Sequence, residues 1–447
     1  MAKTTRAKKR SGNYLLKLLG LGAVILILLI PLSMIQGLVN ERKYTAREAE
    51  ENIMEAWGSQ LVEAGPVITI PGVRTIVTRT HTEKEGEKIE IKEEHFTLVI
   101  TPRKLNINAD FTTEMRYRGI FSVPLFSGKL NISGSFNPRQ AMASIAANER
   151  LFLNQAELNI ALANQKGIRK INSAKWNNRN LFFQPTIRGM NSLTTSSSSG
   201  ISAALPFLIG QEANFDISID IQGGQSVKFL PLGQDTQVII SADWNSPSFQ
   251  GAFLPISRSI TDQSFTAQWN ISYLSRNIPL FWRETTGRGN YSASLFGVDF
   301  FRQIDTYSLN TRAVKYGILF LIVPFLALFL MEIFAKRRIH PVPYMLSGIG
   351  NILFYLLLLS FSEQIPFFRA YFLSATSVAV MMTLYSRALI GSWSKSWYMG
   401  LVMALSYILL YAVLNAESYA LLIGSIGAFI VTALIMYLTR KLDWYKK

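Results

Sequence analysis

The stretch LLGLGAVILILLIPLSMIQGLV at residues 18–39 is long, apolar and free of charge. About 20 such residues cross the roughly 30 Å hydrocarbon core of a bilayer as a helix. Five later stretches have the same character, so the sequence predicts six transmembrane helices. The predicted helices are Leu18–Val39, Tyr316–Met331, Val342–Ser362, Ala370–Ser386, Ser396–Ala416 and Ser418–Thr439.

The basic residues predict which way these helices cross the membrane. Both terminal tails and the loops on the same side of the membrane are rich in Lys and Arg and contain a single acid, Asp443. Basic short loops stay cytoplasmic, so both termini are expected in the cytoplasm and residues 40–312 outside it. The first helix is expected to be an uncleaved anchor, because its apolar run exceeds the 7–15 residues typical of a signal peptide. The basic residues on that side are Lys3, Arg6, Lys8, Lys9, Arg10, Lys17, Lys336, Arg337, Arg338, Arg387, Lys395, Arg440, Lys441, Lys446 and Lys447.

Composition narrows the classes of function. The chain has 447 residues, 49% of them hydrophobic and 17% charged, with a formal net charge of +16. Most of that charge lies at the predicted cytoplasmic edges, where it fits anionic lipid rather than nucleic acid. With no cysteine and three histidines, disulfides and thiolate chemistry are excluded. The lipid bilayer is therefore an expected partner, and no cofactor is expected.

Residues 40–312 are predicted to form a β-rich, mostly antiparallel domain. Alternation of apolar and polar residues, typical of half-buried strands, runs through 105–111, 215–221 and 265–273. The charged run 40–57 predicts a helix continuing out of the membrane. Gly223-Gly224 is interpreted as a hairpin turn, and a helix is expected at Pro138–Leu153, with Asn137 as its cap.

The expected division is a tail at 1–17, an anchor at 18–39, the outer domain at 40–312, a helix bundle at 313–439 and a tail at 440–447. The serine-rich stretch 192–200 is the only low-complexity segment and is interpreted as a mobile loop or linker within the outer domain. Two interpretations stay open, two lobes at about 40–190 and 205–312 or one sandwich with a long surface loop.

The outer domain contains candidate residues for metal binding and for carboxylate-based hydrolysis. His81 and His95 flank an acidic stretch, but interleaved lysines favour a solvated hairpin over a metal site. Asp243 and Asp262 lie near tryptophans and are the acids that a carboxylate-based hydrolase would use. No nucleophile motif or phosphate-binding loop is present. The aromatic residues near these acids, expected in the core or around a binding pocket, are Trp244, Phe253 and Trp269.

The membrane half favours a packed scaffold over a transport path. Asn351 is its main buried polar residue and is expected to make a hydrogen bond between helices, whereas transporters place ionisable groups at mid-membrane. Small residues predict close helix contacts; they are Ser347, Gly348, Ala420, Gly424 and Ala428. Glu363, Arg369 and Glu417 are expected to form an ion-pair cluster at the outer face.

Several stretches, in this order along nearly the whole chain, resemble the CreD family of cell-envelope-integrity proteins. They include Val39–Arg42, Gly65–Pro71, Tyr117–Pro124, Phe229–Gly233, Asp243-Trp244, Gly251–Pro255, Arg312–Tyr316, Arg338–Val342 and Tyr437–Tyr445. The resemblance implies a multi-pass inner-membrane protein of Gram-negative bacteria with a large periplasmic domain, induced by the CreBC two-component system. It further implies a part in stress response, colicin tolerance and antibiotic response, with no established catalytic residues.

The resulting hypothesis is a non-enzymatic inner-membrane protein whose periplasmic domain binds or scaffolds an envelope component. Another envelope protein, a lipid or peptidoglycan is the expected partner class. A transporter or lipid-handling protein using the last five helices is the alternative, and a periplasmic hydrolase is a weaker one. The sequence predicts neither the ligand nor the oligomeric state.

Overall fold

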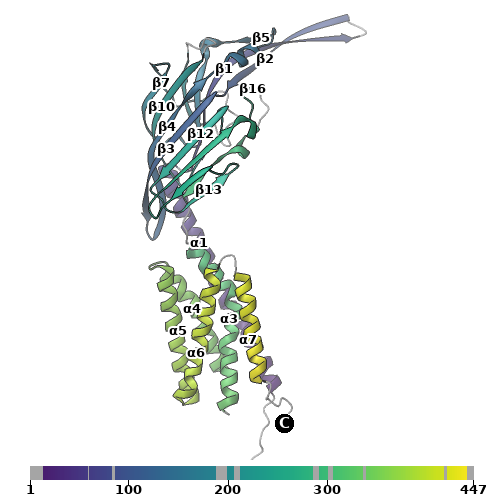
Figure 1. Ribbon diagram of the computed structural model, residues 1–447. Helices are drawn as coiled ribbons and strands as arrows, with labels where there is room; N and C mark the ends of the chain where they lie inside the picture. Colours follow the sequence, from purple (N-terminus) through teal and green to yellow (C-terminus); the bar gives the residue numbers. More distant parts are fainter. Residues whose placement is uncertain are drawn as a thin grey trace, which may run out of the picture. The chain divides into compact units, whose positions relative to one another are not determined.

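A computed structural model describes most of the chain and divides it into two compact units. One unit contains residues 1–46 and 304–447 and is helical, and the other, Arg47–Gln303, is built mostly of strands (Figure 1). The residues that the structure describes are 14–58, 60–82, 86–187, 199–205, 212–284, 291–300, 306–335, 339–416 and 420–439.

The helices of the first unit follow the predicted apolar stretches. They are α1 (Tyr14–Trp57), α3 (Thr306–Ala335), α4 (Pro341–Ser362), α5 (Phe367–Ile390), α6 (Trp393–Asn415) and α7 (Ala420–Thr439). Among the described residues, five helices are long and apolar enough to cross a membrane, namely α1 and α3 to α6. The sixth crossing, by α7, stays a prediction. As expected from the charged run 40–57, α1 continues as a helix to Trp57.

Local sequence explains where the shorter helices begin and end. Proline at position 341 opens α4, where its missing N–H costs no hydrogen bond, and the His340 side chain accepts a hydrogen bond from the Val342 amide. Gly391 ends α5 in the left-handed conformation (φ 73°), which glycine adopts without strain.

The second unit contains two sheets. The nine-stranded sheet is formed by β1 (Leu61–Thr82), β2 (Gly86–Ile100), β5 (Glu149–Leu151), β6 (Glu157–Leu162), β9 (Gly200–Ala204), β11 (Ser226–Phe229), β13 (Pro247–Gly251), β16 (Phe281–Glu284) and β17 (Phe296–Phe300). The eight-stranded sheet is formed by β3 (Lys104–Arg118), β4 (Phe121–Phe136), β7 (Ile168–Trp176), β8 (Arg179–Asn180), β10 (Ala213–Gly224), β12 (Asp235–Ala242), β14 (Ser257–Ile260) and β15 (Phe265–Ser272). The short helices are α2 (Arg139–Ala143), η1 (Leu153–Gln155), η2 (Gln165–Gly167), η3 (Tyr273–Ser275) and η4 (Ser292–Ser294).

The strands are ordered β14-β15-β12-β3-β4-β10-β7-β8 in one sheet and β13-β17-β11-β1-β2-β16 in the other, where β5 and β6 also pair with β1 and β9 pairs with β6. Two pairs, β1 with β11 and β3 with β12, are parallel. The other pairs between named strands are antiparallel, so the prediction of a mostly antiparallel domain is confirmed.

A single hydrophobic core joins the two sheets. The Phe126 ring of β4 lies 5.2 Å from that of Phe300 in β17, and Trp269 of β15 lies 5.6 Å from Phe296 of β17. Because each sheet takes strands from both halves of the unit, residues 47–303 form one sandwich, and the two-lobe interpretation is wrong. Residues 192–198 of the serine-rich stretch lie outside the described residues.

The alternating patterns became strands with one buried face, as predicted. Buried and exposed side chains alternate strictly in the first half of β3, from Lys104 to Asp110, and along β15 every second residue is buried. The same period runs along most of β10.

Two local expectations were wrong. Gly223 and Gly224 remain in β10, paired with Phe126 and Leu125 of β4, and the chain then passes through Gln225 to β11 in the other sheet. A Cβ at Gly224 would lie 3.2 Å from Met54 of α1, so the glycine allows this helix to approach. The helix expected at 138–153 is only the five-residue α2, although Asn137 accepts a hydrogen bond from the Arg139 amide. A turn instead takes the chain into β5.

Candidate functional site

The hairpin of β1 and β2 extends beyond the rest of its sheet (Figure 1). β5 pairs with β1 only at residues 72–74, and β16 pairs with β2 only at residues 97–100. Beyond these positions β1 and β2 still pair with each other, from Thr75 opposite Glu93 to Thr82 opposite Gly86. We call residues 76–82 and 86–93 the arm. Among the described residues, no third strand pairs with the arm.

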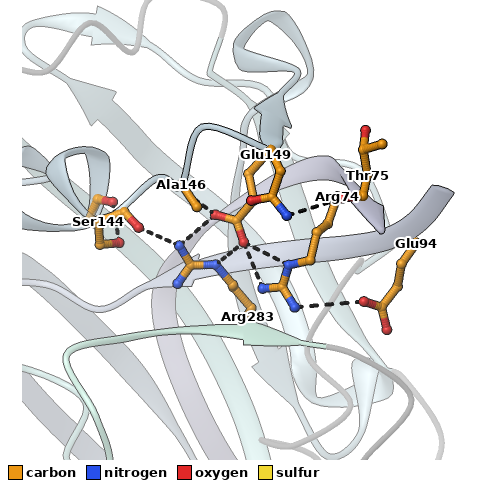
Figure 2. Close-up of polar contacts among 9 residues, drawn as sticks. Arg74, Thr75, Glu94, Ser144, Ala146, Glu149 and Arg283 are labelled. Carbon is orange, nitrogen blue, oxygen red and sulfur yellow. Dashed lines mark hydrogen bonds and ion pairs between the residues drawn. The ribbon is translucent and has the colours of Figure 1, made fainter. Parts of the chain in front are cut away.

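Figure 2 shows the ion cluster at the base of the arm, centred on Glu149 of β5. Arg74 of β1 donates to Glu149 Oε1 at 2.7 and 3.0 Å. Arg283 of β16 donates to Oε1 at 2.8 Å and to Oε2 at 2.7 Å, and also to the Ser144 carbonyl. The Ala146 amide donates to Oε2 at 3.2 Å. The cluster therefore ties β1, β5 and β16 together, with Glu94 3.7 Å from Arg74 at its edge.

The Glu149 carboxylate is buried and charged. Its side chain is 2% exposed, yet the hydrogen bonds from Arg283, and then those from Arg74 and the Ala146 amide, outweigh the effect of burial. They lower the pKa of Glu149 from 4.5 to about 2. Both oxygens are occupied by donors, so this carboxylate is suited to fixing strands and not to taking a proton from a substrate.

Glu63 lies at the start of the same strand β1 and has the opposite environment. It is fully buried, and neither carboxyl oxygen has a hydrogen-bond partner among the described residues. Burial raises the pKa of Glu63 well above its usual value, because a charge without partners is costly in an apolar interior. At its register position Glu63 faces Leu162 of β6 and Phe229 of β11.

Polar contacts join α1, α3 and α4 at both ends of the helical unit. At one end Lys17 of α1 forms an ion pair with Glu332 of α3, and Tyr344 of α4 donates to Glu332 at 2.9 Å. At the other end Arg42 of α1 lies 3.9 Å from Glu363, which also accepts a hydrogen bond from Tyr307. Nearby, Asn310 donates to Ser362 at 2.8 Å.

A third set of polar contacts lies in the interior of the helical unit. Asn351 of α4 donates to the Phe320 carbonyl of α3 at 3.0 Å and accepts from the Tyr407 hydroxyl of α6 at 2.9 Å. Tyr371 of α5 donates to the Tyr407 carbonyl at 2.6 Å. Four helices are thus linked around one buried amide, which leaves Asn351 few free hydrogen-bonding positions for a substrate.

The aromatic residues predicted as core or pocket belong mainly to the core. Trp269 is fully buried and donates to the Phe253 carbonyl at 3.1 Å. Trp244 is half-buried and packs edge-on against Phe300. Phe253 is half-buried and packs edge-on against Phe296.

Asp243 and Asp262, the two acids that a hydrolase would use, are both exposed. Asp243 accepts a hydrogen bond from the Thr113 amide at 2.5 Å, which ties the end of β12 to β3. Among the described residues, no group of three or more His, Asp or Glu side chains could hold a metal ion. His95 is exposed, and the side chain of His81 lies outside the described part of the chain.

The predicted outer-face cluster is only partly described. Glu363 contacts Arg42 and Tyr307, whereas Arg369 is exposed on α5 and, within the described ranges, forms no ion pair with Glu363. Glu417 lies outside the described residues. Arg42 was missed as a partner because it lies in the long charged run after the first helix, where the sequence does not single out one residue.

The small residues of α4 lie at close helix contacts. A Cβ at Gly348 would come within 2.2 Å of Leu28 of α1 and 2.9 Å of Phe325 of α3. Ser347 is buried and bonds to its own helix at Pro343. In α7, Gly424 has no described atom within 4 Å of a Cβ, whereas Gly427 approaches Leu409 of α6 at 2.9 Å. The side chains of Ala420 and Ala428 are not among those described.

Sequence reasoning missed the Glu149 cluster. Arg74, Glu149 and Arg283 are separated by 75 and 134 positions along the chain, and each looks like an ordinary surface charge. The available signal was weak: Glu149 falls inside the segment expected to be a helix, where it seemed to need no partner.

The fold and these contacts define a multi-pass membrane protein that also carries a β-sandwich. The family described as Inner membrane protein CreD matches residues 13–445, and the chain belongs to that family. The chain is 27% identical over 433 residues to inner membrane protein CreD of Escherichia coli K12, covering 96% of this chain and 93% of that protein. The predicted resemblance is confirmed, and with it the assignment to the inner membrane.

Comparisons of the fold give only distant similarities. An M1 zinc metallopeptidase from Deinococcus radiodurans is 10% identical, with 39% of this chain and 38% of that chain covered and a TM-score of 0.20. A Legionella pneumophila protein described as nutrient binding is 8% identical, with 49% and 72% covered and a TM-score of 0.26. Similarities this low carry no argument about function.

Proposed function

We propose that this protein is a non-catalytic component of the cell envelope whose sandwich binds or scaffolds an envelope partner. Membership of the CreD family supports an envelope-related role in the inner membrane. The observation that carries the proposal is the arm, a two-stranded element that extends beyond its sheet and has a fixed base.

The arm offers what an extended polypeptide recognises. An unpaired strand edge presents backbone N–H and C=O groups to an added strand, and alternate side chains then provide specificity. Val77 and Ile91 are cross-strand partners on the arm and are 52% and 67% exposed. We therefore favour another envelope protein over lipid or peptidoglycan as the partner of the arm.

The fixed base helps such binding. Ordering a flexible segment costs free energy at the moment of association. The bonds from Arg74 and Arg283 to Glu149 hold β1 and β16 before any partner arrives. A partner would then meet an arm whose direction is already set.

We also propose the topology that the charges support: six membrane crossings, both termini in the cytoplasm and residues 40–312 in the periplasm. The Lys17–Glu332 pair supports it, because it brings the start of α1 and the end of α3 to the same end of the helical unit. The bonds of Asn351 to α3 and α6 support a packed scaffold over a transport path.

A crosslinking experiment in intact cells tests the proposal. A photoreactive amino acid replaces Ile91 in the full-length chain, and the matched control places it at Leu274, which is 80% exposed and outside the arm. We expect a discrete adduct with an envelope component from position 91 that position 274 does not give. Equal labelling at both positions, or none at 91, would contradict a binding role of the arm.

A further inference from the structure

The arm has an open strand edge along β2. On one side β2 pairs with β1 from Gly86 to Ile100 without a shift in register. On its other side β2 pairs with β16, and only at residues 97–100. Among the described residues, positions 86–96 of that second edge therefore pair with no strand.

A hydrogen bond beside the arm shows which backbone groups point out of this edge. The Thr75 amide of β1 donates to the Asn148 carbonyl at 2.9 Å, on the side of β1 that faces away from β2. In an antiparallel pair the residue opposite, here Glu93, then also directs its backbone groups away from its partner strand. Because this direction alternates along a strand, Ile91, two residues further on, presents its N–H and C=O groups at the open edge.

The charges along this edge are arranged about Ile91. Ile91 is 67% exposed, and its neighbours Glu90 and Lys92 are exposed as well. Three positions to either side of Ile91 the sequence has Lys88 and Glu94. At both distances the residue before Ile91 and the residue after it carry opposite charges. An antiparallel copy of the same strand, centred on the same residue, therefore meets opposite charge at each of these positions.

The charges also select the register of such a pairing. With Ile91 opposite Ile91 of a second copy, Glu90 lies opposite Lys92 and Lys88 lies opposite Glu94. A slip of two residues in one direction would place Lys88 opposite Lys92, and in the other direction Glu90 opposite Glu94. Like charges directly opposite each other are destabilising. A slip of one residue would misalign the outward backbone groups and exchange the faces of the strand.

We propose that the arm pairs with the arm of a second copy of this chain, antiparallel and centred on Ile91. The two β2 edges then form one continuous sheet, with hydrogen bonds between the outward backbone groups and opposite charges on both sides of the central isoleucines. The interface uses the same surface on both copies, as in a two-fold dimer. This inference rests on the proposed function, because it names the polypeptide that the arm binds.

The absence of cysteine from the chain allows a direct test. The full-length Ile91→Cys variant is oxidised in the membrane, and a disulfide between two copies is read as a doubled mass on a denaturing gel. Residues opposite each other in a hydrogen-bonded pair have Cα atoms about 5.5 Å apart, which suits a disulfide. The matched control is Glu93→Cys, exposed on the same edge. In this register the two copies of residue 93 lie about 13 Å apart along the strands.

Charge variants in the Ile91→Cys background test the recognition itself. Glu90→Lys places a lysine opposite Lys92 at both symmetric positions, so the yield of disulfide should fall about tenfold. Adding Lys92→Glu to the same chain restores opposite charges at both positions, and the yield should return to that of Ile91→Cys alone. Rescue of this kind is not expected if the charges act only on the folding of the arm.

We expect a disulfide dimer from position 91, none from position 93, and rescue by Lys92→Glu. No dimer from position 91, equal dimer from both positions, or no rescue would overturn the pairing of two arms. The photocrosslinking experiment separates this failure from that of the proposed function. An adduct of position 91 with a different protein, without the disulfide dimer, would overturn only the present inference, whereas the absence of both products would contradict both.

Discussion

The sandwich has two projecting hairpins, the arm of β1 and β2 and the hairpin of β3 and β4, and they are fixed in different ways. Among the described residues, 115–118 of β3 and 121–124 of β4 pair only with each other. The arm is fixed at its base by a buried carboxylate held between two arginines. The hairpin of β3 and β4 is fixed by the contact of the Arg116 guanidinium with the Trp57 ring of α1, and its turn region carries the exposed residues Tyr117 and Arg118. The difference teaches that one sandwich can fix a projecting hairpin either through ion pairs among its own strands or through contact with the end of α1.

The largest expected effect comes from removing the anchor of the arm. Glu149→Ala leaves Arg74 and Arg283 without their carboxylate, and breaking a buried pair costs several kcal/mol. We expect the free energy of unfolding of the sandwich to fall by about 3 kcal/mol. Urea unfolding of the full-length protein in detergent, read by hydrogen exchange in peptides of β1 and β16, measures it.

The control for this prediction is Glu94→Gln. Glu94 contacts the same Arg74 but its side chain is 40% exposed and 3.7 Å away. Exposed pairs contribute at most about 1 kcal/mol, so little change is expected. A loss as large as that of Glu149→Ala would contradict the central role of Glu149.

The same anchor predicts a pH dependence. The pKa of Glu149 is about 2 in the folded protein against a usual 4.5. Its stabilisation is therefore complete above pH 4.5 and is lost as the pH falls from 4.5 toward 2. Over this range the free energy of unfolding should change less with pH for Glu149→Ala than for the natural chain. The same pH dependence in both proteins would contradict a charged Glu149 in the fold.

Glu63, at the other end of β1, should make the stability of the sandwich depend on pH in the opposite direction. Because the folded-state pKa of Glu63 is raised, Glu63 does not destabilise the folded sandwich below pH 4.5. Its destabilising effect grows as the pH rises above that value. Glu63→Gln removes that effect, so it should stabilise the sandwich progressively, by about 1.4 kcal/mol per pH unit until the folded pKa is reached. Equal pH profiles of both proteins above pH 4.5 would show that Glu63 is not protonated in the fold.

A smaller effect is expected where the hairpin of β3 and β4 meets α1. Arg116→Ala removes the contact with the Trp57 ring, and exposed cation–π contacts contribute about 0.5–1 kcal/mol. Faster hydrogen exchange in the β3–β4 turn, with the arm unchanged, is the expected result. Exchange that also rises in the arm would mean that the two hairpins are not independently fixed.

Periodicity made much of the fold predictable from the sequence. The apolar stretches became α1 and α3 to α6, and the alternating stretches became β3, β10 and β15, because burial of one face or of a whole segment leaves a local signal. The order of the strands in the two sheets leaves no such local signal in the sequence. Gly223-Gly224 looked like a hairpin turn, and only the pairing with β4 shows that the chain crosses between sheets there.

The sites were less predictable than the fold. Asn351 stands out as a polar residue in an apolar stretch. That contrast predicted a hydrogen bond between helices, and Asn351 makes such bonds to α3 and α6. The Glu149 cluster depends on partners from distant strands, and no local pattern marks them. The helix expected at 138–153 ends at Ala143, and Glu149 within that range lies in β5, bonded to arginines of two other strands.

The most direct test of the account is whether the arm is needed for envelope integrity. Cells lacking the protein are complemented with the full-length chain carrying Ile91→Lys or, as control, Leu274→Lys, at matched levels in the membrane, and the permeability of the envelope is measured. We predict that the Leu274→Lys chain restores the barrier and that the Ile91→Lys chain does not. Full restoration by Ile91→Lys, or an unchanged barrier in cells lacking the protein, would contradict the proposed role of the arm.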